Sequence, residues 1–600
     1  MTVSTWRRFA IPAALAVAGW LSVVATIDPA GDYPWLGEGP GVTVDESINV
    51  QIGVLMVDRL LDGDFAGYQQ ILVDMHDYPP LGRLWLGVWH EFAYLIAPPQ
   101  RSRDVYVVAC ARIGSAVAFG LLLAAMWWYT SKWHGRAAGF AAAAAVFVTP
   151  RLFGHAHIAS LETCMNLAYL LAVFVMADRW GNEDRGWKME DGASNGTALP
   201  SALLHPPSSA APGWLAAVLA GIVFGLALLT KIQAILLPVP VAIWAVWNWR
   251  RRAVLPLVIW GTVALVVMLI GWSWLWSHPV GRMRIYLSQT TQRISLPVWY
   301  LGQSVRDREV AWHYPWVMFA TTVPFGLLVL GAWGVLSGRR SQKSEVRNQR
   351  SDRPDAPHDP RSTIHDLPSS ILHPRSTLLL ACLVFPLVVF SIPRVAVYDG
   401  ERLFLVSYPL WCVFAGVGAS KLFDVLSSRW NAAKAGCRRA GLVTAIVIVA
   451  QGCGLATTAP CWLSHYNVLV GGLRGAEQIG LSTTYWADSF TRSFLREVAA
   501  AVPEGSTVDV VPVMTPTQLP WLERQSPLLR DRQIRLRAFR DDNEPPPKYF
   551  MVYLRKDAIE PWQRDTPPGA KVLAELRRSG VRLAALFELP DAPEAGAKPN

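Results

Sequence analysis

The feature that most constrains this 600-residue chain is a series of long apolar runs separated by shorter polar segments. About twenty apolar residues form a helix long enough to cross the hydrocarbon of a bilayer. Candidate runs lie at residues 9–27, 105–129, 137–149, 158–178, 213–229, 232–249, 253–277, 315–337, 377–392, 403–425 and 440–458. They predict an all-α polytopic membrane protein with about eleven transmembrane helices, of which the third is short enough to be broken or tilted.

The charged residues support this class and predict an orientation. Only 17% of residues are charged. Soluble domains carry about 25% charged residues, so the low charge argues against one large soluble core. The net charge of +10 arises because Lys and Arg gather in alternate loops, as the positive-inside rule requires, so it indicates no nucleic-acid partner. The rule places the N-terminus inside and residues 459–600 outside. In a bacterium this predicts a multi-pass inner-membrane protein whose C-terminal domain is periplasmic.

The chain therefore divides into a transmembrane domain, 1–458, and a C-terminal cap, 459–600. Residues 186–212 and 338–375 contain few large apolar side chains, which predicts two disordered cytoplasmic loops. The cap shows strand patterns at 508–513, 534–539, 548–554 and 582–589 and helix patterns at 490–502 and 570–579. These patterns predict a small soluble α/β domain.

The first outer loop, 28–104, is too long to be a simple connection. Its stretches 47–61 and 81–96 are amphipathic and predict helices lying in the membrane interface. Asp45-Glu46 precedes the first stretch, and a proline-containing motif precedes the second, so both motifs lie at helix N-termini, where backbone N–H groups favour anions. The alternatives are a capping box from Thr43 to Glu46 and a rigid proline turn. Because adjacent helical residues do not share a face, Asp45 and Glu46 are expected to divide their roles.

The order of several motifs resembles a known family. The resemblance is to the GT-C glycosyltransferases of the protein O-mannosyltransferase and aminoarabinose-transferase group, which use polyprenyl-phosphate-linked sugars, and it covers roughly residues 9–460. Its motifs are Asp45-Glu46, His76–Arg83, Ala111-Arg112, Arg151–Glu162 and Thr230-Lys231. Three departures are found. Asp77 and Tyr78 interrupt the usual His-Pro, with Arg83 replacing lysine, and Glu162 stands where the family usually has aspartate.

The resemblance implies a reaction and roles for particular residues. The reaction is transfer of a sugar, with inversion, from polyprenyl phosphate to a hydroxyl of a protein, lipid or glycan. A base takes the acceptor proton and cations hold the leaving phosphate. The catalytic candidates are Asp45, as the base, and Glu46. The phosphate candidates are Arg83, Lys231 and Arg402, all of which the predicted topology places near the outer membrane face. The acceptor or sugar candidates are His76, Asp77 and Glu162.

Structural alternatives remain for these residues. Lys231 could snorkel to the interface, Arg402 could be an interfacial anchor, and Glu162 could form a salt bridge with Arg151. No cofactor is required by the sequence, but it leaves open a divalent metal ion held by histidines 76, 155 and 157 with the carboxylates of positions 45 and 162.

Two other classes of function compete with the transferase. One is a transporter or flippase of lipid-linked sugars, which would need ionisable groups at mid-membrane depth and paired repeats. The other is a noncatalytic scaffold that presents the cap. Catalysis requires the Asp45 carboxylate to face a cavity that also receives Arg83 and Lys231, whereas a carboxylate that only caps its helix favours the scaffold.

Overall fold

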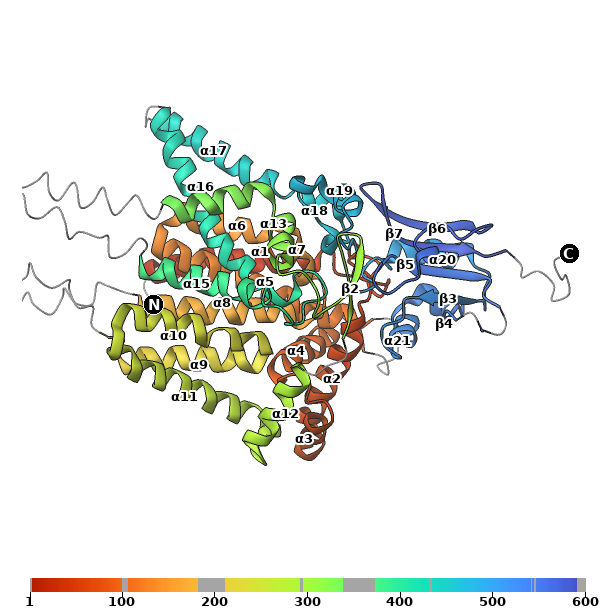
Figure 1. Cartoon of the computed structure of the whole chain (residues 1–600), viewed down its shortest axis with the longest axis horizontal. Helices are drawn as coiled ribbons and strands as arrows, with labels where there is room; N and C mark the ends of the chain where they lie inside the picture. Colours follow the sequence, from red (N-terminus) through yellow and green to blue (C-terminus); the bar gives the residue numbers. More distant parts are fainter. Residues whose placement is uncertain are drawn as a thin grey trace, which may run out of the picture.

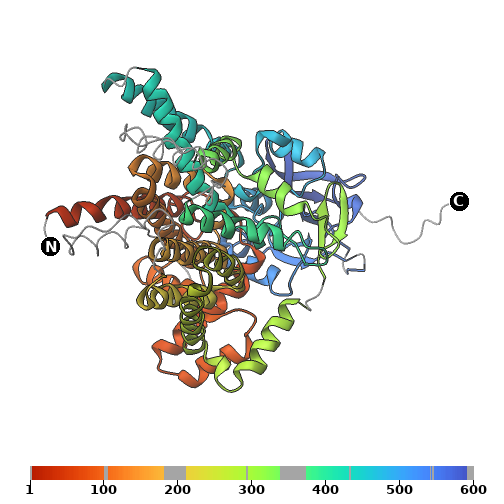
Figure 2. The same cartoon turned by 60° about the vertical axis from the view of Figure 1, so that its left-hand side comes forward.

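The computed structural model describes residues 3–99, 106–181, 211–291, 295–337, 373–430, 434–540, 542–543 and 546–590. Figure 1 shows a bundle of helices on one side and a β-sheet on the other, and Figure 2 shows the same division from a second direction. The helices before the cap are α1 (Val3–Val24), α2 (Val44–Leu61), α3 (Phe65–Asp74), α4 (Pro80–Ile96), α5 (Val108–His134), α6 (Arg136–Phe147), α7 (Pro150–Ala156), α8 (Leu161–Trp180), α9 (Trp214–Thr230), α10 (Pro238–Trp249), α11 (Val254–Gly271), α12 (Pro279–Thr291), α13 (Tyr314–Thr322), a helix at Phe325–Ser337, α15 (Pro374–Val389), α16 (Ser407–Arg429), α17 (Lys434–Ala450) and α18 (Cys453–Thr458). Short 3₁₀ turns η3 (Ile232–Leu236), η4 (Arg250–Ala253), η5 (Ser273–Trp276) and η7 (Arg402–Phe404) and a hairpin, β1 (Pro297–Tyr300) with β2 (Gln303–Arg306), connect them.

The apolar helices fit a multi-pass membrane protein. In the part of the chain that the structure describes, five helices are long and apolar enough to cross a bilayer, or seven if each of two bent pairs is a single span. The 40-residue run Ile232–Gly271 covers two of the predicted spans, and three further apolar helices are shorter than a full span. The predicted all-helical membrane fold is therefore found, but the number of eleven spans is not confirmed.

The two bent pairs break where proline interrupts the helix. α6 and α7 meet at 68° across Val148 and Thr149, and α7 begins with Pro150. α13 and Phe325–Ser337 meet at 109°, with Pro324 at the break. Proline has no N–H to donate and disfavours helical geometry in the preceding residue, so each run is split in two. The third apolar run, predicted to be broken or tilted, thus ends at a break before Pro150.

The predicted loops 186–212 and 338–375 lie outside the described residues, apart from 211–212 and 373–375. The first outer loop is described, and it contains three helices rather than the two predicted, because α3 (Phe65–Asp74) lies between α2 and α4. Helices α2 and α4 cross at Gly53 and Gly87. A Cβ at Gly87 would lie 2.1 Å from the Gly53 carbonyl oxygen, so the crossing requires glycine. This close packing fixes the N-termini of α2 and α4 relative to each other.

The C-terminal part contains an α/β domain built on one five-stranded sheet. Its elements are η8 (Trp462–Ser464), η9 (Val468–Val470), α19 (Gly472–Gln478), α20 (Arg492–Ala501), β3 (Thr507–Val511), α21 (Gln518–Gln525), α22 (Pro527–Arg530), β4 (Arg535–Ala538), β5 (Tyr549–Tyr553), η10 (Pro561–Gln563), β6 (Lys571–Arg578) and β7 (Val581–Glu588). The strand order is β4-β3-β5-β7-β6, with parallel pairs around β3 and antiparallel pairs around β7. The predicted small α/β domain is therefore present.

One cap element was predicted wrongly. Residues 570–579 form strand β6 and not a helix, because β6 and β7 make a hairpin. Its turn residues Ser579 and Gly580 have φ of 48° and 82°. Two successive positive values are what a tight two-residue hairpin turn uses. Ser-Gly between two apolar-polar runs was the sequence signal for this turn. Cross-strand pairing to β7 outweighs the weak helical propensity of the segment.

The cap is seated on the first outer loop by hydrogen bonds and ion pairs. Arg492 pairs with Asp28 at 2.7 Å, and the backbone N–H of Gly41 donates to the Asp488 carbonyl at 2.8 Å. The backbone N–H of Val44, the first residue of α2, donates to the carbonyl of Trp486. The main apolar core also continues from the helical bundle into the sheet. The cap thus holds the start of α2, where the candidate acids lie.

Candidate functional site

Asp45 and Glu46, although adjacent, point to different partners. The Glu46 carboxylate is fully buried and accepts from the Arg112 guanidinium at 2.7 and 2.8 Å, from the backbone N–H of Ala159 at 2.7 Å and from that of Thr43 at 2.8 Å. Glu46 therefore forms the predicted capping box and joins α2 to α5 and to the turn before α8. The Asp45 side chain remains 29% exposed and pairs with Arg402. Asp45 does not cap its helix.

Asp45 belongs to an ion-pair network of four side chains, which are Asp45, Arg402, Glu162 and Lys231. Arg402 binds Asp45 through Nη2 and donates from Nε to Glu162 Oε1 at 2.5 Å. Lys231 Nζ donates to the same Glu162 oxygen at 2.6 Å. Glu162, Lys231 and Arg402 are at least nine-tenths buried as side chains, so Asp45 is the exposed member. The two cations and the two carboxylates give the network no net charge.

Each member of the network lies at the end of a helix, on the side of the bundle that carries the cap. Asp45 is in the first turn of α2, and Glu162 is in the first turn of α8. Lys231 follows the last residue of α9, and Arg402 opens η7 just before α16. The helix N-termini of α2 and α8 favour the carboxylates there. The network therefore brings together predicted residues from all three assigned roles.

Arg83 lies beside the network rather than in it. Its guanidinium binds both oxygens of Asp77, at 2.8 and 3.0 Å, and donates to Asn49 Oδ1 at 3.1 Å. The Tyr78 ring links it to the network, because the Arg83 guanidinium lies 5.0 Å and Lys231 Nζ 5.9 Å from the ring centre. Both contacts are within cation–π range. The structure thus pairs Asp77 with Arg83, and places Arg83 and Lys231 against the same Tyr78 ring.

A narrow cavity of about 10 Å³, which is room for about one water molecule, lies beside Arg402 and Lys231. Its wall includes Glu162, Asn166 and Gln233, and within the described residues Glu162 Oε2, Asn166 Oδ1 and Gln233 Oε1 have no hydrogen-bond partner. Buried acceptor oxygens are costly without a donor. The cavity is therefore suited to a group that donates hydrogen bonds, such as a hydroxyl or a water molecule.

The predicted salt bridge between Glu162 and Arg151 is wrong. Arg151 pairs instead with Glu401 at 3.0 Å and donates to the carbonyl of His465, while Lys231 and Arg402 neutralise Glu162. Burial alone would raise the pKa of the Glu401 carboxyl, but Arg151 and His155 outweigh burial and lower it. This second ion pair holds the segment that carries Arg402.

The three candidate histidines do not gather around the carboxylates of Asp45 and Glu162. His76 stacks on Trp274 at 4.6 Å, away from the network, His155 lies 3.7 Å from Glu401, and His157 bonds to Thr26 at 2.9 Å. Among the described residues, no group of three or more His, Cys, Asp and Glu side chains is close enough together to hold a metal ion. The metal site that the sequence left open is therefore not formed by these side chains.

Sequence reasoning missed the side chains that the cap contributes. The Trp486 ring lies 4.9 Å from the Arg402 guanidinium, and Asp399, 3.5 Å from Arg402, also binds Arg555 at 3.0 Å. Trp486 and Arg555 lie in the cap segment, far along the chain from Arg402. No local spacing relates them to it, so the sequence carried no signal for these contacts.

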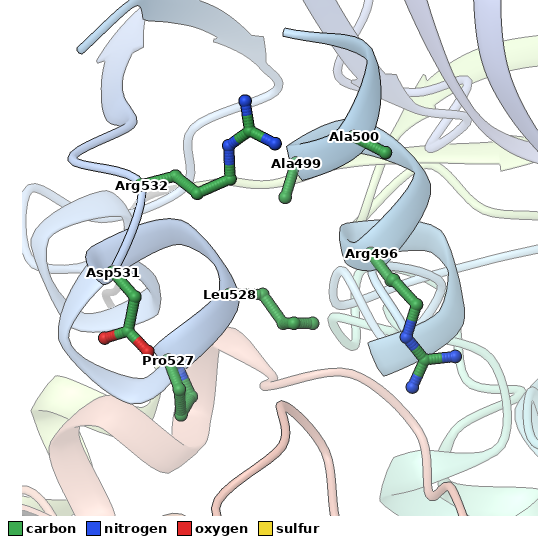
Figure 3. Close-up of a pocket in the computed structure, with 7 residues that line it drawn as sticks. All are labelled: Arg496, Ala499, Ala500, Pro527, Leu528, Asp531 and Arg532. Atoms are coloured by element: carbon green, nitrogen blue, oxygen red, sulfur yellow. The ribbon is translucent and has the colours of Figure 1, made fainter. Parts of the chain in front are cut away.

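A larger surface cavity of about 320 Å³ lies between α20 and α22 in the cap. Figure 3 shows Leu528 pointing into its centre, with Arg532 on one side. Its lining contains none of the candidate residues, whereas Glu162, Lys231 and Arg402 line the narrow cavity. The ion-pair network offers more specific chemistry than this surface cavity. A partly exposed carboxylate beside two buried cations can accept a proton while the cations bind an anion.

Among known proteins, similarity to this chain is found in solved structures. No protein-family model and no curated protein matches the chain. ArnT from Cupriavidus metallidurans matches in its apo state with 13% identity and a TM-score of 0.48, over 98% of both chains. The same protein bound to undecaprenyl phosphate matches with 14% identity and a TM-score of 0.48, again over 98% of both chains.

A second similar structure is the archaeal oligosaccharyltransferase AglB from Archaeoglobus fulgidus, in complex with an inhibitory peptide and a dolichol-phosphate. It matches with 10% identity and a TM-score of 0.42, over 92% of this chain and 69% of that one. ArnT and AglB are glycosyltransferases of the GT-C class, the class that the sequence motifs resemble.

Proposed function

We propose that this protein is a membrane glycosyltransferase that moves a sugar from a polyprenyl-phosphate donor to an acceptor hydroxyl on the cap side of the bilayer. The observation that carries the proposal is the ion-pair network, in which the exposed carboxylate of Asp45 shares Arg402 with the buried pair Glu162 and Lys231. Proximity of a base and two cations at the end of apolar helices suits a donor whose tail lies in lipid and an acceptor that arrives from water.

In the proposed reaction, Arg402 and Lys231 bind the donor phosphate. The phosphate replaces the Asp45 carboxylate as a partner of Arg402, and Asp45 then takes the proton of the acceptor hydroxyl. The acceptor oxygen attacks the anomeric carbon from the face opposite the phosphate, so the configuration inverts. The bond between that carbon and the phosphate oxygen breaks, and polyprenyl phosphate leaves with its negative charge held by the two cations.

The other candidate residues take supporting roles in this proposal. Glu162 orients both cations, and its free oxygen, with Asn166 and Gln233, accepts from a hydroxyl of the sugar. Glu46 is buried in structural contacts and holds α2 in place. Arg83 reaches phosphate only if it releases Asp77, whose side chain is 54% exposed.

The rival functions are less well supported. The charges of the network lie at helix ends near the cap, whereas a transporter needs ionisable groups along a path through the bilayer. A scaffold would use Asp45 only as a helix cap, but Glu46 forms the cap and Asp45 faces Arg402. Lys231 and Arg402 line the narrow cavity, whereas Asp45 and Arg83 do not, so the cavity that catalysis requires is present only in part. The contact of Asp45 with Arg402 favours the transferase over the scaffold.

The test compares membranes from cells that express no protein, the wild type or Asp45→Asn. Mass spectrometry of lipid-linked sugars, glycolipids and glycoproteins is expected to show a product with added sugar mass for the wild type only. Asp62→Asn, an exposed carboxylate at the other end of α2, is the matched control and should behave as wild type. Normal product formation by a correctly inserted Asp45→Asn protein would remove Asp45 as the base.

A further inference from the structure

The segment that carries Arg402 is held from two sides, by the helical bundle and by the cap. Asp399 and Gly400 adopt φ of 55° and 66°, so the chain makes a tight left-handed turn directly before Glu401 and Arg402. A Cβ at Gly400 would lie 3.0 Å from the Tyr485 ring of the cap. The cap therefore packs against the turn with no space for a larger residue.

A cap arginine binds the acid of this turn. Arg555 Nη2 pairs with Asp399 Oδ1 at 3.0 Å, and Arg555 Nε pairs with Asp557 at 3.1 Å. A third Arg555 nitrogen donates to the carbonyl of Tyr485 at 3.1 Å. The side chains of Asp399, Arg555 and Asp557 are all 4–6% exposed, so these charges interact with little screening.

Asp399 is also within reach of Arg402, with Nη1 of Arg402 3.5 Å from Asp399 Oδ2. Asp399 thus lies between two arginines, one in the network and one in the cap. Without Arg555, the buried Asp399 carboxylate would have Arg402 as its remaining cation among these contacts. Arg402 would then be drawn toward Asp399 and away from the position it shares with Asp45 and Glu162.

We infer that Arg555 of the cap is a positioning residue for the anion-binding site, which acts by neutralising Asp399 so that Arg402 is directed at the donor phosphate. The Trp486 ring, 4.9 Å from the Arg402 guanidinium, limits its movement on the same side. In this inference the cap contributes to the phosphate-binding site as well as packing against it. This inference rests on the proposed function, because it assumes that Arg402 binds the phosphate.

The experiment measures binding of undecaprenyl phosphate to the purified full-length protein in detergent by native mass spectrometry. Arg555→Ala is expected to bind this lipid about tenfold more weakly than the wild type, within the coupling range of contacting residues. Arg555→Lys, which keeps the charge but loses the forked geometry, is expected to fall between them. Arg537→Ala is the matched control, because Arg537 forms an ion pair with buried Asp509 in the same sheet, and it should bind as wild type.

The double variant Arg555→Ala with Asp399→Asn separates positioning from a general loss of structure. Asparagine tolerates positive φ and removes the charge that competes for Arg402, so it should recover most of the lost affinity. Wild-type binding by Arg555→Ala, or a double variant no better than the single one, overturns the inference. If Arg555→Ala does not fold, Arg555→Gln, which removes the charge but fills more of the same space, replaces it, and wild-type binding by Arg555→Gln overturns the inference. Wild-type binding by Arg402→Ala instead overturns the phosphate site of the proposed function.

Discussion

Replacing Glu162 by glutamine is the sharpest perturbation of the ion-pair network. One oxygen of Glu162 accepts from both Lys231 Nζ, at 2.6 Å, and Arg402 Nε, at 2.5 Å, and its side chain is 2% exposed. Glutamine keeps the shape but leaves two buried cations with Asp45 as the remaining carboxylate of the network. Removing one partner of a buried ion pair costs about 3–5 kcal/mol.

The cost converts into a measurable change in melting temperature. An unfolding entropy of about 2.1 cal/mol/K per residue amounts to about 1.3 kcal/mol/K for a chain of this length, so the midpoint should fall by about 2–4 °C. Undecaprenyl phosphate should reverse part of this loss, because the freed cations bind its phosphate more tightly. A tenfold gain in affinity adds about 1.4 kcal/mol to the stabilisation by a saturating ligand, or about 1 °C.

The assay is thermal unfolding of the purified protein in detergent, with and without undecaprenyl phosphate. Glu91→Gln is the matched control, since Glu91 is buried and pairs with His90 at 2.9 Å away from the network. The control should lose stability without gaining a larger shift from the lipid. The reasoning is refuted if Glu162→Gln melts with the wild type, or if the lipid raises both midpoints equally.

Three further substitutions test neighbouring parts of the site. Glu46→Gln removes the carboxylate that binds Arg112 and should cost about 3–5 kcal/mol, seen as loss of the monodisperse peak in size-exclusion chromatography. Gly400→Ala places a methyl group 3.0 Å from the Tyr485 ring, at a φ of 66°. Left-handed backbone is unfavourable for alanine, so this variant should melt lower by the equivalent of about 1–2 kcal/mol. Burial, aided by the nearby Arg151, lowers the pKa of His465 from its usual value of 6.5 to about 3. Below pH 6.5 the unfolded chain therefore takes up a proton on this histidine, whereas the folded chain does not. Stability should therefore fall by about 2 kcal/mol between pH 7 and pH 5, and His465→Gln should remove this part of the pH dependence in thermal unfolding.

The helical part was predictable because its signal is local. A run of about twenty apolar residues has few structures open to it in a bilayer, and prolines such as Pro150 mark where a run breaks. The count of full spans was less predictable, since helices such as Pro374–Val389 are shorter than a span. Strand β6 was missed because eight residues of mixed pattern fit a helix or a strand, and pairing with β7 decides between them.

The candidate site shows a similar limit. The topology predicted from the loop charges placed Asp45, Lys231 and Arg402 near one membrane face, and in the structure the three side chains belong to one ion-pair network. It did not reveal that Arg402 binds Asp45, because 357 residues separate them and only the tertiary fold brings them together. The contact of Arg555 could not be predicted either, because it depends on how the cap packs on the turn at Asp399.

The balance of charge in the network identifies which carboxylate a donor phosphate would displace. A phosphate that enters beside Lys231 and Arg402 adds negative charge, so one carboxylate has to release a cation. Glu162 accepts from both cations and is 2% exposed, whereas Asp45, among the residues that the structure describes, pairs with Arg402 alone and is 29% exposed. Asp45 can be rehydrated at lower cost and is therefore the group released. Donor binding would then uncover the base, so carbodiimide labelling of Asp45, followed by peptide mass spectrometry, should rise when undecaprenyl phosphate is added. Equal or lower labelling would contradict this order of events.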